Sequence, residues 1–318
     1  MSQSLIGFDV GGQSVKAAVV NESAEVTARG RRVTGADTTA ESLAASIGAL
    51  LDDLVDGVRP ESLGVGIAGV VGTTGNLEGS PNMPALTGRP IAKELSDLLG
   101  ARVVVENDAN CAAYAEGWFG AADGVADYLV VTLGTGLGSG VVIAGGLYRG
   151  STGYACELGH SIVHAGGRRC GCGNLGCLEA YASEAAMRTI IVERDDDLTA
   201  EVLSRVSDED EGYTQALYAL AEGSASNATV ARMAQREAEE MIRMLGIGLA
   251  SAVNVFDIET VVIAGGIAPA VLSRLDDLKS AMATSLFARP IDAVRVLPSV
   301  HGNDAGSIGA ARLAGESL

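Results

Sequence analysis

The chain has 318 residues, 47% of them hydrophobic, and its 40 acidic residues against 22 Lys and Arg give a formal net charge of −18. This length predicts a sizeable core divided between two domains, and the acidic balance argues against a nucleic-acid partner. We expect neither a signal peptide nor a membrane span, because the apolar runs are short or interrupted, and five cysteines without an export signal predict free thiols in a cytoplasmic protein.

The first part of the chain alternates between extended and helical patterns. Residues 5–33 contain three β-rich runs separated by Gly-Gly-Gln-Ser and Asn-Glu-Ser turns, which predicts an antiparallel meander. The helix-like residues 41–57 then lead to a strand at 64–71, and the helix-like residues 91–100 lead to a strand at 101–107. This alternation is typical of parallel strands covered by helices, so we expect an α/β domain.

The second part repeats this beginning and then becomes helical. Residues 127–150 again contain β-rich runs around glycines, residues 178–255 are mostly helix-like, and the acidic segment 194–212 predicts a solvated surface. A buried strand returns at 260–268, and a helix of small residues ends the chain. We predict a small α/β domain over residues 1–118, completed by the C-terminal helix 304–318, and a large α/β domain over 119–303. Because no low-complexity linker separates them, an interdomain cleft is expected.

Three glycine-rich loops follow predicted strands. They are Asp9 to Gly12, Thr132 to Gly140, and Ile263 to Ala268. Glycines let backbone amides approach an anion closely, so each loop is a candidate phosphate site, although the first taken alone is better explained as a plain hairpin turn. No Gly-Lys-Ser/Thr follows them, and no Gly-x-Gly-x-x-Gly opens a helix in a βαβ unit, which argues against a Walker loop and a dinucleotide fingerprint.

A histidine and three cysteines lie close together in the sequence. His160 precedes the run Cys170-Gly-Cys172-Gly-Asn-Leu-Gly-Cys177. Three thiolates and one imidazole are the ligands of a closed tetrahedral zinc site, and the intervening glycines allow tight bends. With all four positions filled by protein, the zinc would be structural. A redox Cys-x-Cys pair beside an unrelated histidine is the alternative.

Polar residues near strand ends complete the candidate site. Asp108 directly follows the strand at 101–107 and begins a helix-like segment, which places it where open sheets bind ligands, or else makes it a helix cap. Glu157 and Glu179 flank the Cys/His cluster, so a metal there would bring both carboxylates close to the imidazole. Together with the amides of Asn82 and Asn107, such groups suit the hydroxyls of a sugar.

Taken in order, these motifs resemble the ROK family of bacterial repressors and sugar kinases, within the actin-like ATPase and hexokinase-like (ribonuclease H-like) fold. The segments DVGGQSVKA and LGTGLGSG are similar to its phosphate loops, VVENDAN to its catalytic segment, and ELGH with CGCGNLGCLE to its sugar and zinc signature. The resemblance covers nearly the whole chain. It implies an ATP-dependent kinase that phosphorylates the 6-hydroxyl of glucose, with Mg²⁺ carried mainly by the nucleotide, and a homodimer or homotetramer.

The resemblance also implies a role for each matching residue. Asp108 would be the general base. The hexose would be bound by Asn82, Asn107, Asp108, Glu157, His160 and Glu179. The structural Zn²⁺ would be held by His160, Cys170, Cys172 and Cys177. The nucleotide would be bound by Asp9, Gly11, Gly12, Lys16, Thr135, Gly136, Gly265 and Gly266.

Related functions stay open at this point. Kinases for N-acetylmannosamine, N-acetylglucosamine, mannose or fructose share these motifs, and the segment after Asn82 has Ala85 near the position where family glucokinases commonly carry a tryptophan. A sugar sensor without catalysis is disfavoured by Asp108 and the three glycine loops. A transcriptional repressor is disfavoured because the first loop begins at Asp9, which leaves no room for a DNA-binding domain, and because the chain is acidic.

Overall fold

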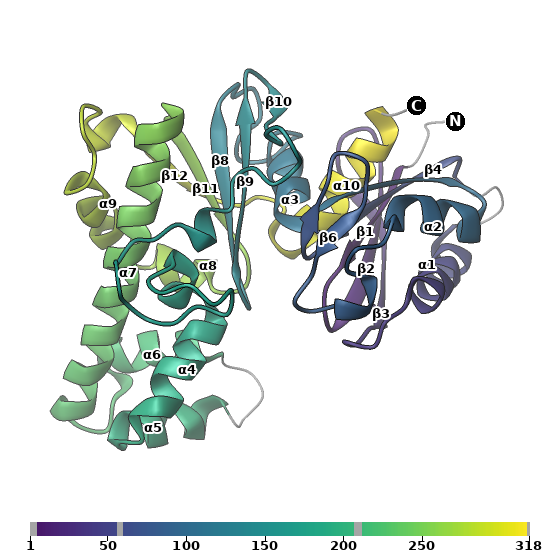
Figure 1. Cartoon of the computed structure of the whole chain (residues 1–318). Helices are drawn as coiled ribbons and strands as arrows, with labels where there is room; N and C mark the ends of the chain where they lie inside the picture. The colour runs from purple at the N-terminus through teal and green to yellow at the C-terminus, as the bar shows by residue number, and fades with distance from the viewer. Residues whose placement is uncertain (1–4, 56–59, 207–211, 317–318) are drawn as a thin grey trace. The chain divides into compact units, whose positions relative to one another are not determined.

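The structure is a computed structural model that describes residues 5–55, 60–206 and 212–316. The chain forms two compact units (Figure 1). Unit 1 comprises Met1–Val130, Ser139–Cys156 and Ser299–Leu318, and unit 2 comprises Val131–Gly138 and Glu157–Pro298. The division into domains at residue 118 stays a prediction. Residues 207–211 of the predicted acidic surface lie outside the described residues.

Unit 1 is built on a five-stranded sheet of order β3-β2-β1-β4-β7. Its strands are β1 (Leu5–Val10), β2 (Ser14–Val20), β3 (Val26–Val33), β4 (Ser62–Ile67) and β7 (Arg102–Asn107), and its helices are α1 (Ala40–Leu54), α2 (Ile91–Leu99), α3 (Asp108–Glu116) and α10 (Ala305–Glu316). A small hairpin adds β5 (Val70–Val71) and β6 (Leu77–Gly79). β1, β2 and β3 pair antiparallel, and β1, β4 and β7 pair parallel, which confirms the predicted meander and the α/β alternation.

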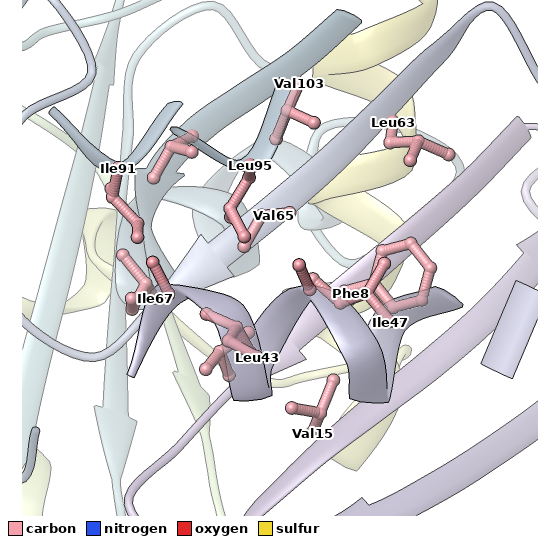
Figure 2. Close-up of a cluster of buried hydrophobic side chains, with 14 of the residues drawn as sticks. Phe8, Val15, Leu43, Ile47, Leu63, Val65, Ile67, Ile91, Leu95 and Val103 are labelled. Carbon is pink, nitrogen blue, oxygen red and sulfur yellow. The ribbon is translucent and has the colours of Figure 1, made fainter. Parts of the chain in front are cut away.

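One face of this sheet is apolar because alternate strand residues point to the same side. Phe8, Leu63 and Val65 are at most 1% exposed and belong to one cluster with Leu43 and Ile47 of α1 (Figure 2). α1 begins with a capping box in which Thr39 and Ser42 exchange side-chain and backbone hydrogen bonds. The core of unit 1 therefore fixes the strands whose carboxyl ends carry the candidate site.

Helix α10 packs closely against β1 and β4 through two glycines. Gly7 and Gly64 are paired across these parallel strands. A Cβ atom at Gly7 would lie 2.0 Å from the Ser307 carbonyl oxygen, and one at Gly64 would lie 1.8 Å from the Ala310 carbonyl oxygen. The small residues of α10 and these two glycines thus allow the helix backbone to touch the sheet.

The second sheet has the order β10-β9-β8-β11-β12. Its strands are β8 (Tyr128–Leu133), β9 (Leu137–Ile143), β10 (Gly146–Leu147), β11 (Thr260–Ala264) and β12 (Arg295–Pro298). The helices of unit 2 are α4 (Glu184–Arg194), α5 (Asp197–Val206), α6 (Tyr213–Ala219), α7 (Ala228–Phe256), α8 (Ala268–Leu272) and α9 (Leu275–Ala283), which confirms the predicted helical segment. Within the described part of the chain, none of the helices has the length and apolar composition needed to cross a membrane.

Candidate active site

The junction between β7 and α3 holds Asp108 in a defined hydrogen-bonded position. Asn107 is the N-cap of α3, and its Oδ1 accepts from the Asn110 amide at 2.9 Å. Asp108 is the first helical residue, and its Oδ1 accepts from the Ala109 amide at 2.9 Å and from Asn107 Nδ2 at 3.1 Å. The cap is therefore Asn107, and the alternative that Asp108 serves as the cap is wrong.

Asn107 is also tied to the neighbouring strand end. Its Nδ2 donates to the Gly69 carbonyl oxygen at 2.9 Å as well as to Asp108. Both amide hydrogens are then used within the protein, since an amide carries two. A sugar hydroxyl can therefore approach the Asn107 side chain only as a donor to its oxygen.

A buried polar group lies directly before this junction. Glu106, 6% exposed, accepts hydrogen bonds from the Asn107 amide, from Asn110 Nδ2 and from Arg149 Nε. The segment VVENDAN contains Glu106 and Asn110, but no role was predicted for either of them, and no motif includes Arg149. The sequence feature that could have pointed to Glu106 is its position, since it is a carboxylate directly after the apolar run Val103 to Val105.

The first glycine loop lies at the end of β1 in the same unit. The Gly11 amide donates to the Ser14 carbonyl at 3.0 Å, which makes a tight turn between β1 and β2. A Cβ atom at Gly12 would lie 2.9 Å from Asn82 Cβ, so this position needs glycine because the exposed Asn82 approaches closely. Neither Gly11 nor Gly12 has a positive φ, so close approach, and not the left-handed conformation, explains Gly12.

Asp9 and Lys16 face each other across β1 and β2. They are partners in the antiparallel register, and Lys16 Nζ lies 3.7 Å from Asp9 Oδ2. Burial raises the pKa of the Asp9 carboxyl, and Lys16 opposes this rise. Asp9 also contacts the first turn of α10, because a Cβ at Gly306 would lie 3.0 Å from Asp9 Cγ.

The four predicted metal ligands lie together in unit 2. One ligand atom from each of His160, Cys170, Cys172 and Cys177 falls within 4.8 Å of every other. His160 Nδ1 faces Cys170 Sγ at 3.8 Å, and Cys172 Sγ faces Cys177 Sγ at 3.6 Å. The imidazole therefore turns one nitrogen toward the thiols, while Nε2 is the nitrogen left for another partner.

Turns and short helices build this cluster. Cys170 and Cys172 lie on a tight turn in which the Cys170 amide donates to the Asn174 carbonyl at 2.9 Å. Gly173 and Gly176 have φ values of 96° and 86°, and a Cβ at Gly176 would lie 1.8 Å from the His164 carbonyl oxygen. These two positions confirm that glycine permits the bends that bring the cysteines together.

The donor set fits a tetrahedral zinc ion, and a redox pair explains it less well. Burial raises the pKa of the Cys170 thiol to about 12 and also raises that of Cys177, whereas a hydrogen bond from the Asn174 backbone lowers that of Cys172. A cation among three thiols stabilises their thiolates and removes this penalty. His160 would complete a Cys₃His set that leaves no open position for catalysis.

Two carboxylates lie beside the cluster. Glu157 immediately precedes the short helix η2 (Leu158–His160), and Glu179 lies within η3 (Leu178–Ala180). The pKa of the Glu157 carboxyl is raised, mainly because the group is desolvated. His160 opposes this rise, and the negative charge of Glu179 adds to it. Glu179 Oε2 accepts from the Leu137 amide at 3.0 Å, and Cys170 Sγ lies 3.6 Å from its Oε1.

Residues 132–138 of the second glycine loop and the whole of the third belong to unit 2. A Cβ at Gly136 would lie 2.6 Å from Glu179 Oε2, so the second loop touches this carboxylate, and the Thr135 carbonyl accepts from the Ala185 amide at the start of α4. In the third loop, Gly265 has a φ of 96°, and Gly266 accepts a hydrogen bond from Gln215 Nε2. Gly265 is thus the position in these loops where the backbone itself requires glycine.

The predicted site residues form two groups. Unit 1 brings together Asn107 and Asp108 at the end of β7, with Asp9, Gly11, Gly12, Lys16 and Asn82 around the end of β1. Unit 2 brings together Thr135, Gly136, Glu157, His160, Cys170, Cys172, Cys177 and Glu179, with Gly265 and Gly266 at the end of β11.

Comparisons with known proteins give the chain relatives along its full length. The glucokinase of Thermotoga maritima is 31% identical over 99% of this chain and 98% of its own length. The glucokinase of Streptomyces coelicolor is 32% identical over 98% of this chain and 97% of its own length. Both alignments therefore include every motif described above.

The fold has a close counterpart among solved structures. A ROK family glucokinase from Streptomyces griseus, solved in complex with glucose and AMPPNP, has a TM-score of 0.82 and 32% identity over 99% of this chain and 100% of that chain. This likeness confirms the predicted hexokinase-like, actin-like ATPase fold. The family model of the ROK family matches residues 5–317. The chain therefore belongs to the ROK family.

Proposed function

We propose that this protein is an ATP-dependent kinase that transfers a phosphoryl group to the 6-hydroxyl of glucose. The observation that carries the proposal is the full-length likeness to a ROK family glucokinase whose structure holds glucose and AMPPNP. The hydrogen-bonded position of Asp108 at the end of β7 supports it, because ligands of open sheets bind at the carboxyl ends of the strands.

Asp108 is the proposed general base. Phosphoryl transfer has a loose transition state and needs little covalent help, so positioning and charge stabilisation supply most of the rate. The Asp108 carboxylate would orient the 6-hydroxyl and accept its proton as the bond to phosphorus forms. Its Oδ1 is already held by Ala109 and Asn107, which limits the rotation of the side chain.

The hexose is assigned to the polar residues that the family resemblance implies. Asn82, Asn107, Glu157 and Glu179 offer amides and carboxylates that suit sugar hydroxyls. His160 turns Nδ1 toward Cys170, so we assign its Nε2 to the sugar. A zinc ion bound by His160 and the three cysteines would act as a structural clamp on this loop, and it would supply no Lewis-acid chemistry because its four positions are filled by protein.

The nucleotide is assigned to the three loops. Gly11, Gly12, Thr135 and Gly136 present backbone amides to the phosphates, and Gly265 with Gly266 lies on the adenine side. Asp9 and Lys16 form an ion pair next to the first loop, where Lys16 would offset phosphate charge. Mg²⁺ would arrive mainly with ATP and supply further charge neutralisation.

We also propose a cellular compartment and an oligomeric state for the enzyme. The five cysteines all lie within the described residues and none of them forms a disulfide, which suits a reducing cytoplasm. A net charge of −18 opposes binding to nucleic acid. We propose a homodimer or homotetramer, which sedimentation equilibrium would test directly.

A coupled assay over a panel of hexoses tests the proposal. The purified protein is given glucose, mannose, fructose, N-acetylglucosamine or N-acetylmannosamine, with ATP or polyphosphate as donor. Glucose with ATP should give the highest kcat/KM, and glucose 6-phosphate should be the product. The kcat/KM for glucose should be higher than that for its 2-epimer mannose. The difference should correspond to about 1–3 kcal/mol of activation free energy for each buried polar group that mannose leaves unpaired.

The same panel distinguishes the alternatives. A higher kcat/KM for N-acetylmannosamine or N-acetylglucosamine would overturn the assignment to glucose and keep the kinase, and the exposed Ala85 after Asn82 is where room for the acetyl group would be sought. Phosphorylation of none of the sugars, with sugar binding intact by calorimetry, would favour a sensor without catalysis.

A further inference from the structure

An ion pair between a buried carboxylate and a partly exposed guanidinium lies close to the proposed general base. The Glu106 side chain is 7% exposed, and its Oε2 lies 2.5 Å from Arg149 Nε. Glu106 ends the apolar part of β7, whereas Arg149 follows β10, 43 residues later in the chain. Both residues belong to unit 1, so this contact lies within one compact body.

The other oxygen of Glu106 connects the ion pair to the start of α3. Glu106 Oε1 accepts from the Asn107 amide at 2.9 Å and from Asn110 Nδ2 at 3.0 Å. Only the NH₂ side of an amide can face a carboxylate in this way, so Glu106 fixes the orientation of the buried Asn110 side chain. The pair therefore holds both the residue before Asp108 and the residue two positions after it.

Asn107 carries this order to Asp108. Its Oδ1 accepts from the Asn110 amide, and its Nδ2 donates to Asp108 Oδ1. A continuous hydrogen-bonded path thus runs from Arg149 through Glu106 and Asn107 to the carboxylate of Asp108. Each step joins a donor to an acceptor at 3.1 Å or less.

Arg149 is itself fixed by the backbone that follows it. Its carbonyl oxygen accepts from the Gly153 amide at 3.1 Å and from the Ala155 amide at 3.3 Å. These bonds close the turn that precedes Cys156, the last residue of this stretch of unit 1. The guanidinium is therefore presented to Glu106 from an ordered turn.

Stability alone does not explain a charge at this place. The Arg149 side chain is 40% exposed, and an ion pair that is screened by solvent on one side commonly contributes little to stability. Removal of Arg149 would nevertheless leave the buried Glu106 carboxylate without its charged partner. Val104 lies on the same face of β7 as Glu106 and packs against an apolar cluster of Cys111, Ala310 and Leu313, so apolar packing is available on this face. An ion pair can also orient a neighbouring group through hydrogen bonds, which apolar side chains cannot do.

We propose that Glu106 and Arg149 are positioning residues that hold Asp108 in the orientation needed to accept a proton. This inference rests on the proposed function only for its catalytic readout. Neither side chain is assigned to substrate. They act through Asn107, by fixing the first turn of α3 and with it the Asp108 carboxylate.

Four variants and one control test the proposal. Glu106→Gln, Arg149→Met, Arg149→Lys and the double variant Glu106→Gln/Arg149→Met are compared with Leu50→Ala, which opens the core of unit 1 at a residue 2% exposed. For each, kcat and KM for glucose are measured with the thermal unfolding midpoint. Hydrogen–deuterium exchange of the peptide 105–112 is followed without substrate.

We expect Arg149→Met to lower kcat by roughly ten- to a hundredfold with little change in KM, because a displaced catalytic group costs about this much. Arg149→Lys should recover part of the loss, and so should the double variant, since it removes the unpaired carboxylate. Exchange in peptide 105–112 should rise in Arg149→Met. Leu50→Ala should lower the unfolding midpoint while it leaves kcat at 25 °C and this peptide near the wild type.

An unchanged kcat and unchanged exchange in Arg149→Met would overturn the proposal. A loss of kcat in Leu50→Ala as large as that in Arg149→Met, at a similar decrease in the unfolding midpoint, would also overturn it, because the loss would then follow from lowered stability alone. If the wild type phosphorylates none of the sugars, the proposed function fails, and the exchange measurement still decides whether the ion pair orders the start of α3.

Discussion

The β7–α3 junction and the Cys/His cluster reach a defined geometry by different means. At the junction, a parallel strand ends and a capped helix begins, so main-chain hydrogen bonds and the side chain of Asn107 place Asp108. The cluster lies among turns and the short helices η2 and η3, where three thiols and an imidazole gather with raised pKa values at two of the thiols. The first region is stabilised by the polypeptide alone, and the second is suited to an ion.

This difference predicts which region fails when a single atom is changed. In the junction, an isosteric substitution should remove chemistry and leave the fold. In the cluster, a similarly small substitution should remove a metal ligand and loosen the whole loop, since metal binding and local folding are coupled.

Asp108→Asn should produce the largest effect. The amide oxygen can still accept from Ala109, so α3 should keep its start, and loss of a charge near the helix N-terminus should cost no more than about 1 kcal/mol of stability. The kcat should fall on the order of a hundredfold or more, because a neutral amide cannot accept the proton. Steady-state kinetics and thermal unfolding measure both, and KM for glucose should stay close to the wild type. Near-normal turnover would remove Asp108 from the mechanism.

Cys172→Ser should act on the other region in the opposite way. We expect loss of bound zinc, a lower unfolding midpoint and a higher KM for the sugar, since His160, Glu157 and Glu179 lie on the loop that the metal would hold. Each kcal/mol of stability lost lowers the midpoint of a domain of this size by about 2–4 °C. Metal analysis by mass spectrometry with differential scanning fluorimetry measures these changes.

The matched control is Cys156→Ser. Cys156 is half-buried, lies outside the cluster and belongs to unit 1, so this variant should keep its zinc. Absence of zinc from the purified wild-type protein would contradict the assignment of the four ligands.

The comparison also shows what the sequence can and cannot predict. Regular elements leave periodic patterns, so the meander over residues 5–33 and the alternation up to residue 107 were predictable, as were the four ligands, because they are close in the chain. Glu106 and Arg149 are 43 residues apart with no shared motif, so their contact depends on tertiary packing. The same holds for position 12, where glycine is needed because Asn82, 70 residues later in the chain, approaches closely.

Where a residue type suits two purposes, its role is harder to predict from the sequence than its position. Asn107 and Asp108 are both good helix caps, and spacing alone left the cap and the base undecided. The structure separates them, since Asn107 makes the capping bond and Asp108 follows it. How these residues meet a sugar stays a prediction.

Asn107 allows the smallest and sharpest of these tests, because its oxygen caps α3 while its nitrogen reaches Asp108 and Gly69. Serine is as good an N-cap as asparagine but has no NH₂ group. Asn107→Ser should therefore keep stability close to the wild type and lower kcat several-fold, whereas Asn107→Ala should also lose about 1 kcal/mol of stability with the cap. Urea unfolding and steady-state kinetics on both variants separate the two effects. Equal kcat values in Asn107→Ser and the wild type would show that the Asn107 nitrogen does not orient Asp108, and the order at this junction would then be only structural.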